Sequence, residues 1–234
     1  MYFNFIDINH YVVGNRDLQP EHSDNYRAEI TWRSQNNPER TSLCLTASGF
    51  YNKVRDRIIL SEYGPTQYRY ANLSRWETTG AGFGVNFSFH NWLRFRSQVV
   101  MTGFFNAFSE GNDSLRMLNW SPDWVNDLTM SFFKQRATCS IWHKMTGRTP
   151  FFFEEDGKVI QGVSEPWDLL NASIGGNFFH QGLRINAGVK NILNVRQIRS
   201  GAADVVGHSE GDFQPVHWGR TYFVTAIFAM HSKS

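Results

Sequence analysis

Charged side chains recur at alternate positions in several segments, where they oppose apolar residues. The charged members of these segments are Arg27, Glu29, Arg33, Arg94, Arg96, Arg184 and Lys190. Alternate residues of a β-strand point to the same side of a sheet, so the pattern predicts one polar face. Guanidinium, ammonium and carboxylate groups on such a face can form ion pairs and hydrogen bonds with whatever lies against it.

A second group of chemically capable residues falls between the alternating segments. His208, Glu210, Asp212 and His217 carry metal-binding side chains, but their spacing matches no closed metal motif and favours a solvated loop. No spacing of a nucleophile, a base and an orienting group stands out, so we expect no enzyme. We also predict no resident metal or cofactor.

Aromatic residues near the same connections suit a flat or aromatic ligand, or alternatively the edge of a membrane. They are Tyr68, Tyr70, Trp120 and Phe152, the last between two further phenylalanines. The sequence alone leaves both interpretations open.

Composition limits the class of protein. The chain has 234 residues, of which 19% are charged and 15% aromatic, with a net charge of +2. These values exclude a disordered chain, and the lack of a basic stripe argues against a nucleic-acid partner. No apolar run reaches the ~18 residues of a transmembrane helix. A transmembrane β-strand needs apolar residues only at alternate positions, so a mean hydropathy of −0.42 is compatible with a barrel.

The alternation predicts an all-β, antiparallel chain of about nine strands. Their expected ranges are 22–34, 41–55, 71–89, 92–108, 122–134, 137–149, 166–180, 183–194 and 218–230. Tight turns alternate with long connections near 56–70, 109–121, 150–165 and 195–217. Short turns on one side and long loops on the other are typical of outer-membrane barrels, whereas a soluble β-sandwich has no reason to sort its loops.

Tryptophan and tyrosine residues are expected to form two belts at the membrane interfaces. One belt, near the short turns, contains Trp32 and Trp92. The other, near the long connections, contains Trp120, Trp124, Trp167, Trp218 and Tyr222. A closed barrel with an even number of strands brings both termini to the same side, so nine strands also predict that this chain does not close a barrel by itself.

Several short motifs occur in an order that resembles TonB-dependent outer-membrane receptors. The segment 14–21, Gly-Asn-Arg-Asp-Leu-Gln-Pro-Glu, resembles the N-P-D-L-K-P-E box of that family, and 50–54 resembles its F-Y-N strand end. Asn72 with Gly80 is similar to its N…G pair. Residues 188–194 and 219–223 resemble the boxes of its last two strands.

This resemblance implies that residues 1–234 are the C-terminal part of a 22-stranded transmembrane β-barrel in the bacterial outer membrane. The plug domain and the first strands would lie upstream, since the N-terminus has no signal-peptide features. The family usually ends at an aromatic residue, whereas here His231-Ser232-Lys233-Ser234 follow the last strand. How such an end is recognised during assembly is left open.

The resemblance also implies a function and partners. The expected function is TonB-energised import of an iron chelate, either a ferric siderophore or haem. The expected partners are the rest of the barrel, the plug, TonB, outer-membrane lipid and a small-molecule chelate. Arg27, Glu29, Arg94, Arg96 and Arg184 would face the plug.

His10 occupies the place where haem-transporting members carry an iron-ligating histidine, and imidazole is a suitable axial ligand. It could equally be a loop histidine without function. The alternatives for the whole chain are a receptor for cobalamin or a glycan, a passive porin, or a soluble β-rich binding protein.

Overall fold

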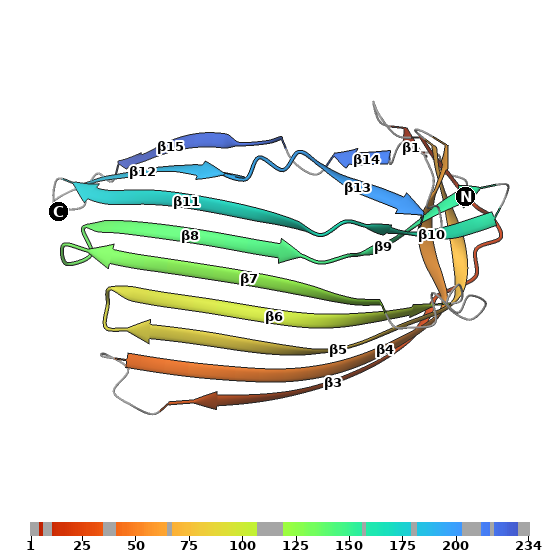
Figure 1. The fold of residues 1–234 in the computed structure, drawn as a ribbon, viewed down its shortest axis with the longest axis horizontal. Helices are drawn as coiled ribbons and strands as arrows, with labels where there is room; N and C mark the ends of the chain where they lie inside the picture. The colour runs from red at the N-terminus through yellow and green to blue at the C-terminus, as the bar shows by residue number, and fades with distance from the viewer. Residues whose placement is uncertain are drawn as a thin grey trace, which may run out of the picture.

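The computed structural model describes residues 5–6, 11–34, 41–64, 67–106, 119–155, 158–178, 182–202, 212–215 and 218–228. Nine long strands form one curved antiparallel wall (Figure 1). They are β3 (His22–Arg33), β4 (Thr41–Gly64), β5 (Gln67–Phe89), β6 (Leu93–Asn106), β7 (Asn119–Phe132), β8 (Ala137–Thr146), β11 (Trp167–Phe178), β12 (Leu183–Lys190) and β15 (Thr221–Phe228). Each corresponds to one of the nine predicted strands, which confirms the all-β class.

The wall is open. Each strand pairs with its neighbours in the order β3-β4-β5-β6-β7-β8-β11-β12-β15, and in the described residues β3 and β15 do not pair with each other. Unpaired strand edges expose backbone N–H and C=O groups, which proteins normally cover or pair. The wall therefore has the form of one section of a larger barrel.

The pairing register gives the wall one polar and one apolar face. On the apolar face, Val99 of β6 lies opposite Phe83 and Trp124. Its neighbour Gln98 points to the polar face, where it lies opposite Gly84 and Val125. Large apolar side chains on the apolar face are strongly exposed, for example Ile30 at 77% and Ile174 at 64%. A soluble protein would cover a surface of this kind, whereas lipid covers it in a membrane barrel.

The two ends of the wall differ as predicted. Tight turns connect β5 to β6 and β7 to β8, and His90 and Gln135 adopt the left-handed conformation there, with φ of 47° and 68°. The long connections gather at the opposite end, together with the short strand β2 (Tyr11–Val13) (Figure 1). In outer-membrane barrels the end with short turns is periplasmic.

Three of the predicted long connections contain further strands. The prediction of a loop at 56–70 is wrong, because β4 and β5 continue through it as a hairpin of 24 and 23 residues. The others hold the pairs β9 (Pro150–Glu155) with β10 (Lys158–Ser164), and β13 (Gln197–Ala202) with β14 (Asp212–Pro215). The three successive phenylalanines of β9 and the short lengths of β10, β13 and β14 leave no period-two alternation in the sequence that would reveal these hairpins.

The outer half of the β4–β5 hairpin, residues 57–70, turns across the long-loop end of the wall (Figure 1). We call it the outer hairpin. Its tip lies beside β9, where Glu62 is paired with Phe153, and β2 runs parallel to β5 from Gln67 to Arg69. The outer hairpin therefore connects two parts of the wall that are separated by three strands.

A small apolar cluster lies where the outer hairpin begins. Ile59, Leu73 and Trp76 are buried together, with Val54 and Phe104 packed beside them. Leu73 and Trp76 are three residues apart and would face opposite sides of a regular strand, so the strand turns over between them. The backbone supports this turn, because Asp56 in the paired strand has a φ of 53°.

We predict that arginine is tolerated differently at two adjacent positions in the middle of β6. Val99→Arg puts a charge on the lipid-facing side and should destabilise the barrel by about 2–4 kcal/mol, whereas Gln98→Arg should have little effect. The measurement is the urea midpoint of the complete protein refolded in lipid vesicles. Equal midpoints for the two variants would contradict the assignment of the faces.

Candidate functional site

The five charged residues predicted to face the plug all lie on the polar face. Arg27 forms an ion pair with Glu29 at 2.9 Å between Nη2 and Oε2. The Nε of Arg96 donates to Oδ1 of Asn86 at 2.8 Å. Arg94 and Arg184 belong to the same face by their register in β6 and β12. Whether a plug lies against them remains a prediction.

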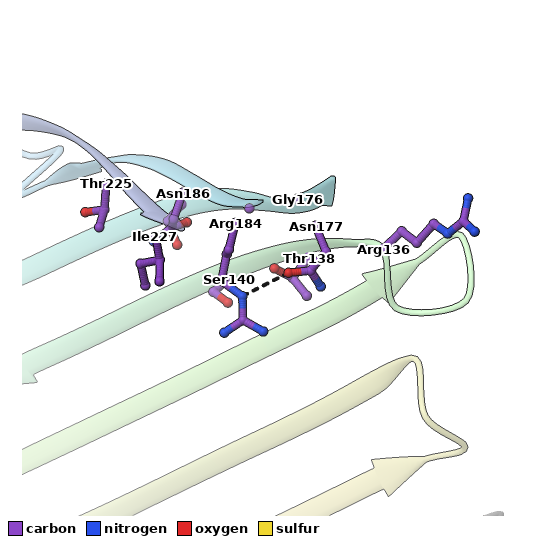
Figure 2. Close-up of a pocket in the computed structure, with 11 residues that line it drawn as sticks. Arg136, Thr138, Ser140, Gly176, Asn177, Arg184, Asn186, Thr225 and Ile227 are labelled. Carbon is purple, nitrogen blue, oxygen red and sulfur yellow. Dashed lines mark hydrogen bonds between the residues drawn. The ribbon is translucent and has the colours of Figure 1, made fainter. Parts of the chain in front are cut away.

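A depression of about 430 Å³ opens on the polar face near the short-turn end (Figure 2). Its lining comes from β8, β11, β12, β15 and the turn before β8. Two arginines, Arg136 and Arg184, contribute to it beside hydroxyl and amide side chains, and none of the lining residues is acidic. Such a surface favours a negatively charged group.

Residues 14–21 are held against the base of the outer hairpin by side chain to backbone hydrogen bonds. Asn72 accepts from the backbone N–H of Gln19 at 2.7 Å and donates to the carbonyls of Gln19 at 3.0 Å and Asp56 at 2.6 Å. Asn15 donates to the carbonyl of Tyr70 at 3.0 Å. The motif therefore fixes the chain where it enters β3.

The last residue of this motif contributes a charge as well as a hydrogen bond. Oε2 of Glu21 accepts from the backbone N–H of Ile58 at 3.0 Å. Burial lowers the pKa of the Arg57 guanidinium, and the nearby Glu21 carboxylate opposes that shift. The guanidinium also lies 4.0 Å from the ring centroid of Trp76, a cation–π distance. These contacts link the motif to the apolar cluster.

The motifs at 188–194 and 219–223 meet at the start of β15. Asn194 Oδ1 accepts from the backbone N–H of Arg220 at 3.0 Å, and the Arg220 side chain donates to the carbonyl of Ile192. Asn191 and Asn194 have φ values of 52° and 60°, a conformation that asparagine tolerates better than most residues. Gly219 has a φ of 87°, which favours glycine.

The predicted ligand contacts divide between different surfaces. Tyr68 and Tyr70 lie on the outer hairpin, and Tyr70 is 40% exposed. Trp120 is 51% exposed and lies on the apolar face with Trp124, which is the membrane-interface alternative. Phe152 belongs to β9, where only the backbone is described.

The histidine predictions lie largely outside the described residues. His10, His208, Glu210 and His217 are not among them, and only the backbone of Asp212 is described. In the part of the chain that the structure describes, no group of three metal-ligating side chains comes together. The same residues contain no helix long and apolar enough to cross a membrane.

The predicted outer aromatic belt is correct for several members and wrong for one. Trp124 and Tyr222 lie on the apolar face, and the Nε1 of Trp124 donates to Oγ of Ser97 at 2.9 Å. Trp167 instead belongs to the polar face, where the Nζ of Lys144 lies 6.0 Å from its ring centroid. The alternation of β11 assigns Trp167 to that side.

A polar network on the apolar face was not predicted. His143 lies between Asn126 and Asp168, with its Nδ1 3.2 Å from the Asn126 amide and its Nε2 2.8 Å from Oδ1 of Asp168. The ring of Trp124 meets that of His143 edge to face. Mutual hydrogen bonding reduces the cost of polar groups on a lipid-facing side. The only sign of this network in the sequence is that all three polar residues occupy alternate positions that belong to the apolar face.

The fold and the arrangement of its faces agree with a comparison against protein families. The model of the outer membrane protein beta-barrel family matches residues 2–208. This chain belongs to the outer membrane protein β-barrel family. It is therefore a bacterial outer-membrane protein, as its alternating strands predicted. A comparison with curated proteins finds no match.

Solved structures of similar fold come from outer-membrane transport proteins. The copper transporter OprC has a TM-score of 0.58 at 14% identity, over 92% of this chain and 33% of that chain. A Q482A mutant of the ferric enterobactin receptor PfeA from Pseudomonas aeruginosa has a TM-score of 0.58 at 16% identity, over 92% and 32%. The FrpB iron transporter from Neisseria meningitidis has a TM-score of 0.57 at 11% identity, and the match covers 93% of this chain and 32% of that chain.

At these identities the likeness establishes the fold. This barrel chain spans about one third of the length of the structures it matches. The open edges at β3 and β15 are consistent with a section of a larger wall.

We predict that Asn72→Ala loosens the segment 14–21. The substitution leaves backbone groups of Gln19 and Asp56 without their partner, which costs about 1–3 kcal/mol. Hydrogen exchange at the Gln19 amide should accelerate roughly 5- to 150-fold. Asn25→Ala is the matched control, because that amide makes only a long 3.4 Å contact with Ser23. Unchanged exchange at Gln19 in the Asn72 variant would contradict this role.

Proposed function

We propose that this chain is the C-terminal barrel portion of a TonB-dependent receptor that imports an iron chelate, either a ferric siderophore or haem. The observation that carries the proposal is the docking of 14–21. The box that resembles the family motif is held by Asn72, a residue of a second matching motif. Two motifs that were separate in the sequence thus form one structural unit.

The form of the wall supports an active receptor over a passive porin. The outer hairpin lies across the long-loop end, and its attachment to β9 and β2 restricts that opening. Barrels of 22 strands hold a plug in the lumen, whereas the smaller porins leave it filled with water. In the proposed receptor the plug domain, which is not part of residues 1–234, would lie against Arg27, Glu29, Arg94, Arg96 and Arg184.

The ligand would bind at the long-loop end. Tyr68 and Tyr70 on the outer hairpin supply aromatic contacts, and Phe152 of β9 lies next in sequence to Phe153, the register partner of Glu62. Trp120 would contact the ligand only from the rim of the wall. His10 is the proposed axial ligand if the cargo is haem. TonB, energised from the inner membrane, would displace the plug while the wall stays fixed.

The test of this function is uptake of radioactive iron by iron-starved cells. Cells with and without the gene receive iron as a ferric catecholate, a ferric hydroxamate or haem, each in the presence and absence of TonB. We expect uptake of one of them to need both the gene and TonB. Uptake that needs the gene but not TonB would indicate a passive porin, and no gene-dependent uptake would reject the iron chelate.

We predict that Tyr70→Ala weakens binding of the imported chelate by the purified complete receptor. Loss of one exposed aromatic contact is worth about 0.5–1.5 kcal/mol, or roughly 2- to 13-fold in Kd. Tyr26→Ala removes a tyrosine from the apolar face that is even more exposed, at 65% against 40%, and should leave Kd unchanged. Equal affinities for the Tyr70 variant and the unaltered receptor would exclude this contact. For haem, His10→Ala provides the parallel test of His10.

A further inference from the structure

The polar face shared by four neighbouring strands contains cations but no carboxylates. Lys144 of β8, with Arg184 and Lys190 of β12, belongs to this face, and Arg136 lies in the turn before β8. The one acidic residue in β8, β11, β12 and β15 is Asp168, which lies on the opposite face. We call the polar face of these four strands, with Arg136, the basic quarter.

Elsewhere on the polar face, some of the cations have a carboxylate beside them. Arg27 is paired with Glu29, and Arg96 lies directly opposite Asp127 in the register of β6 and β7. Among the described residues, by contrast, none of the four cations of the basic quarter forms an ion pair. The Nζ of Lys190 lies 5.6 Å from the ring centroid of Phe223. This section of wall therefore has inward cations and no inward carboxylate of its own.

The guanidinium of Arg184 is held in place with most of its donors unused. Its Nε donates to Oδ1 of Asn177 at 2.9 Å, and the Asn177 amide donates to the carbonyl of Gln135 at 3.4 Å. Figure 2 shows the side chain of Arg184 extending away from the strand that carries it. A guanidinium has five N–H donors, so the terminal nitrogens remain able to bind a carboxylate in a two-pronged arrangement.

The surroundings of Arg184 leave room for such a group. The depression of about 430 Å³ contains Gly175 and Gly176, which have no side chains, together with the hydroxyls of Thr138 and Thr225. Its location on the polar face puts it in the barrel interior.

We propose that the basic quarter is the docking surface for an acidic segment of the plug domain, with one of its carboxylates bound at Arg184. This inference rests on the proposed function, because it requires a plug. The spread of the cations favours a polypeptide over a free anion. Arg184 and Lys190 are six residues apart along one strand, which corresponds to about 20 Å. One small anion cannot neutralise both.

The test uses carbodiimide coupling in the complete receptor, which joins a carboxylate to an amine in direct contact with it. Arg184→Lys supplies an amine at the proposed contact. We expect a coupled peptide in which the new amine at position 184 is joined to an Asp or Glu of the plug. This linkage at position 184 should be absent when Arg184 is retained, because guanidinium does not couple, and coupling through Lys190 is scored as a separate product.

Two lysines of the chain serve as controls in the same sample. Lys53 lies 4.0 Å from Glu77 and should couple to it, which verifies the reaction. Lys134 lies in the exposed turn and should not couple to the plug. Coupling of Lys53 to Glu77 without any plug product from the R184K protein would overturn the proposal.

A second arm distinguishes a free anion from the plug. Inorganic phosphate is titrated against the unaltered receptor and the R184Q variant, with thermal stability as the measurement. Phosphate stabilisation that is lost in R184Q, with no plug coupling in R184K, would assign the depression to a free anion and overturn the docking. TonB-dependent iron uptake by cells carrying the unaltered receptor shows whether the receptor function itself holds, so failure of the docking and failure of the proposed function are distinguishable.

Discussion

Backbone hydrogen bonding in a lipid environment is the constraint on which this structure depends. Hydrocarbon offers no partners for N–H and C=O groups, so each strand in a membrane must pair on both sides. The seven inner strands of the wall do so, and β3 and β15 are its two edges. The need to pair these edges makes the wall a section of a barrel, and its register decides which side chains face lipid and which face the interior.

The register also explains why the proposed ligand and plug contacts separate. A strand presents alternate residues to lipid and to the interior, so Arg94 and Arg96 share the inside while Phe95 faces out. The proposed ligand contacts lie beyond the regular wall, because the outer hairpin turns over at Asp56 and crosses the opening. The docked segment 14–21 holds the base of that hairpin through Asn72. In the proposed receptor the wall would act as a fixed frame for partners that move.

Much of this fold could be predicted because alternation is a direct consequence of a two-sided environment. The alternation of apolar and polar residues predicted all nine wall strands. It also predicted the face on which Arg27, Arg94 and Arg184 lie. The face of Trp167 was also available from the alternation of β11, but its proximity to a long connection suggested the lipid belt instead. The outer hairpin could not be predicted, because it lies beyond the two-sided wall and the successive apolar residues Ile58, Ile59 and Leu60 break the alternation.

The function of individual side chains was less accessible from the sequence. Nothing near Asn72 signals that it binds backbone groups 53 residues away, because that contact depends on the pairing of β3, β4 and β5. The charge imbalance of the basic quarter likewise appears only once β8, β11, β12 and β15 are known to be neighbours.

The central claim is that one face of this wall meets lipid and the other the barrel interior, and the two native cysteines test it directly. Cys139 lies on the apolar face opposite Met130 and Ile174, and Cys44 on the polar face opposite Arg33 and Asn86. Spin labels are attached to the C44S and C139S proteins in lipid vesicles, and their collision rates with oxygen and with a water-soluble nickel complex are compared. The account predicts that the label on Cys139 collides mainly with oxygen and the label on Cys44 relatively more with nickel. The same ratio at both sites would contradict it.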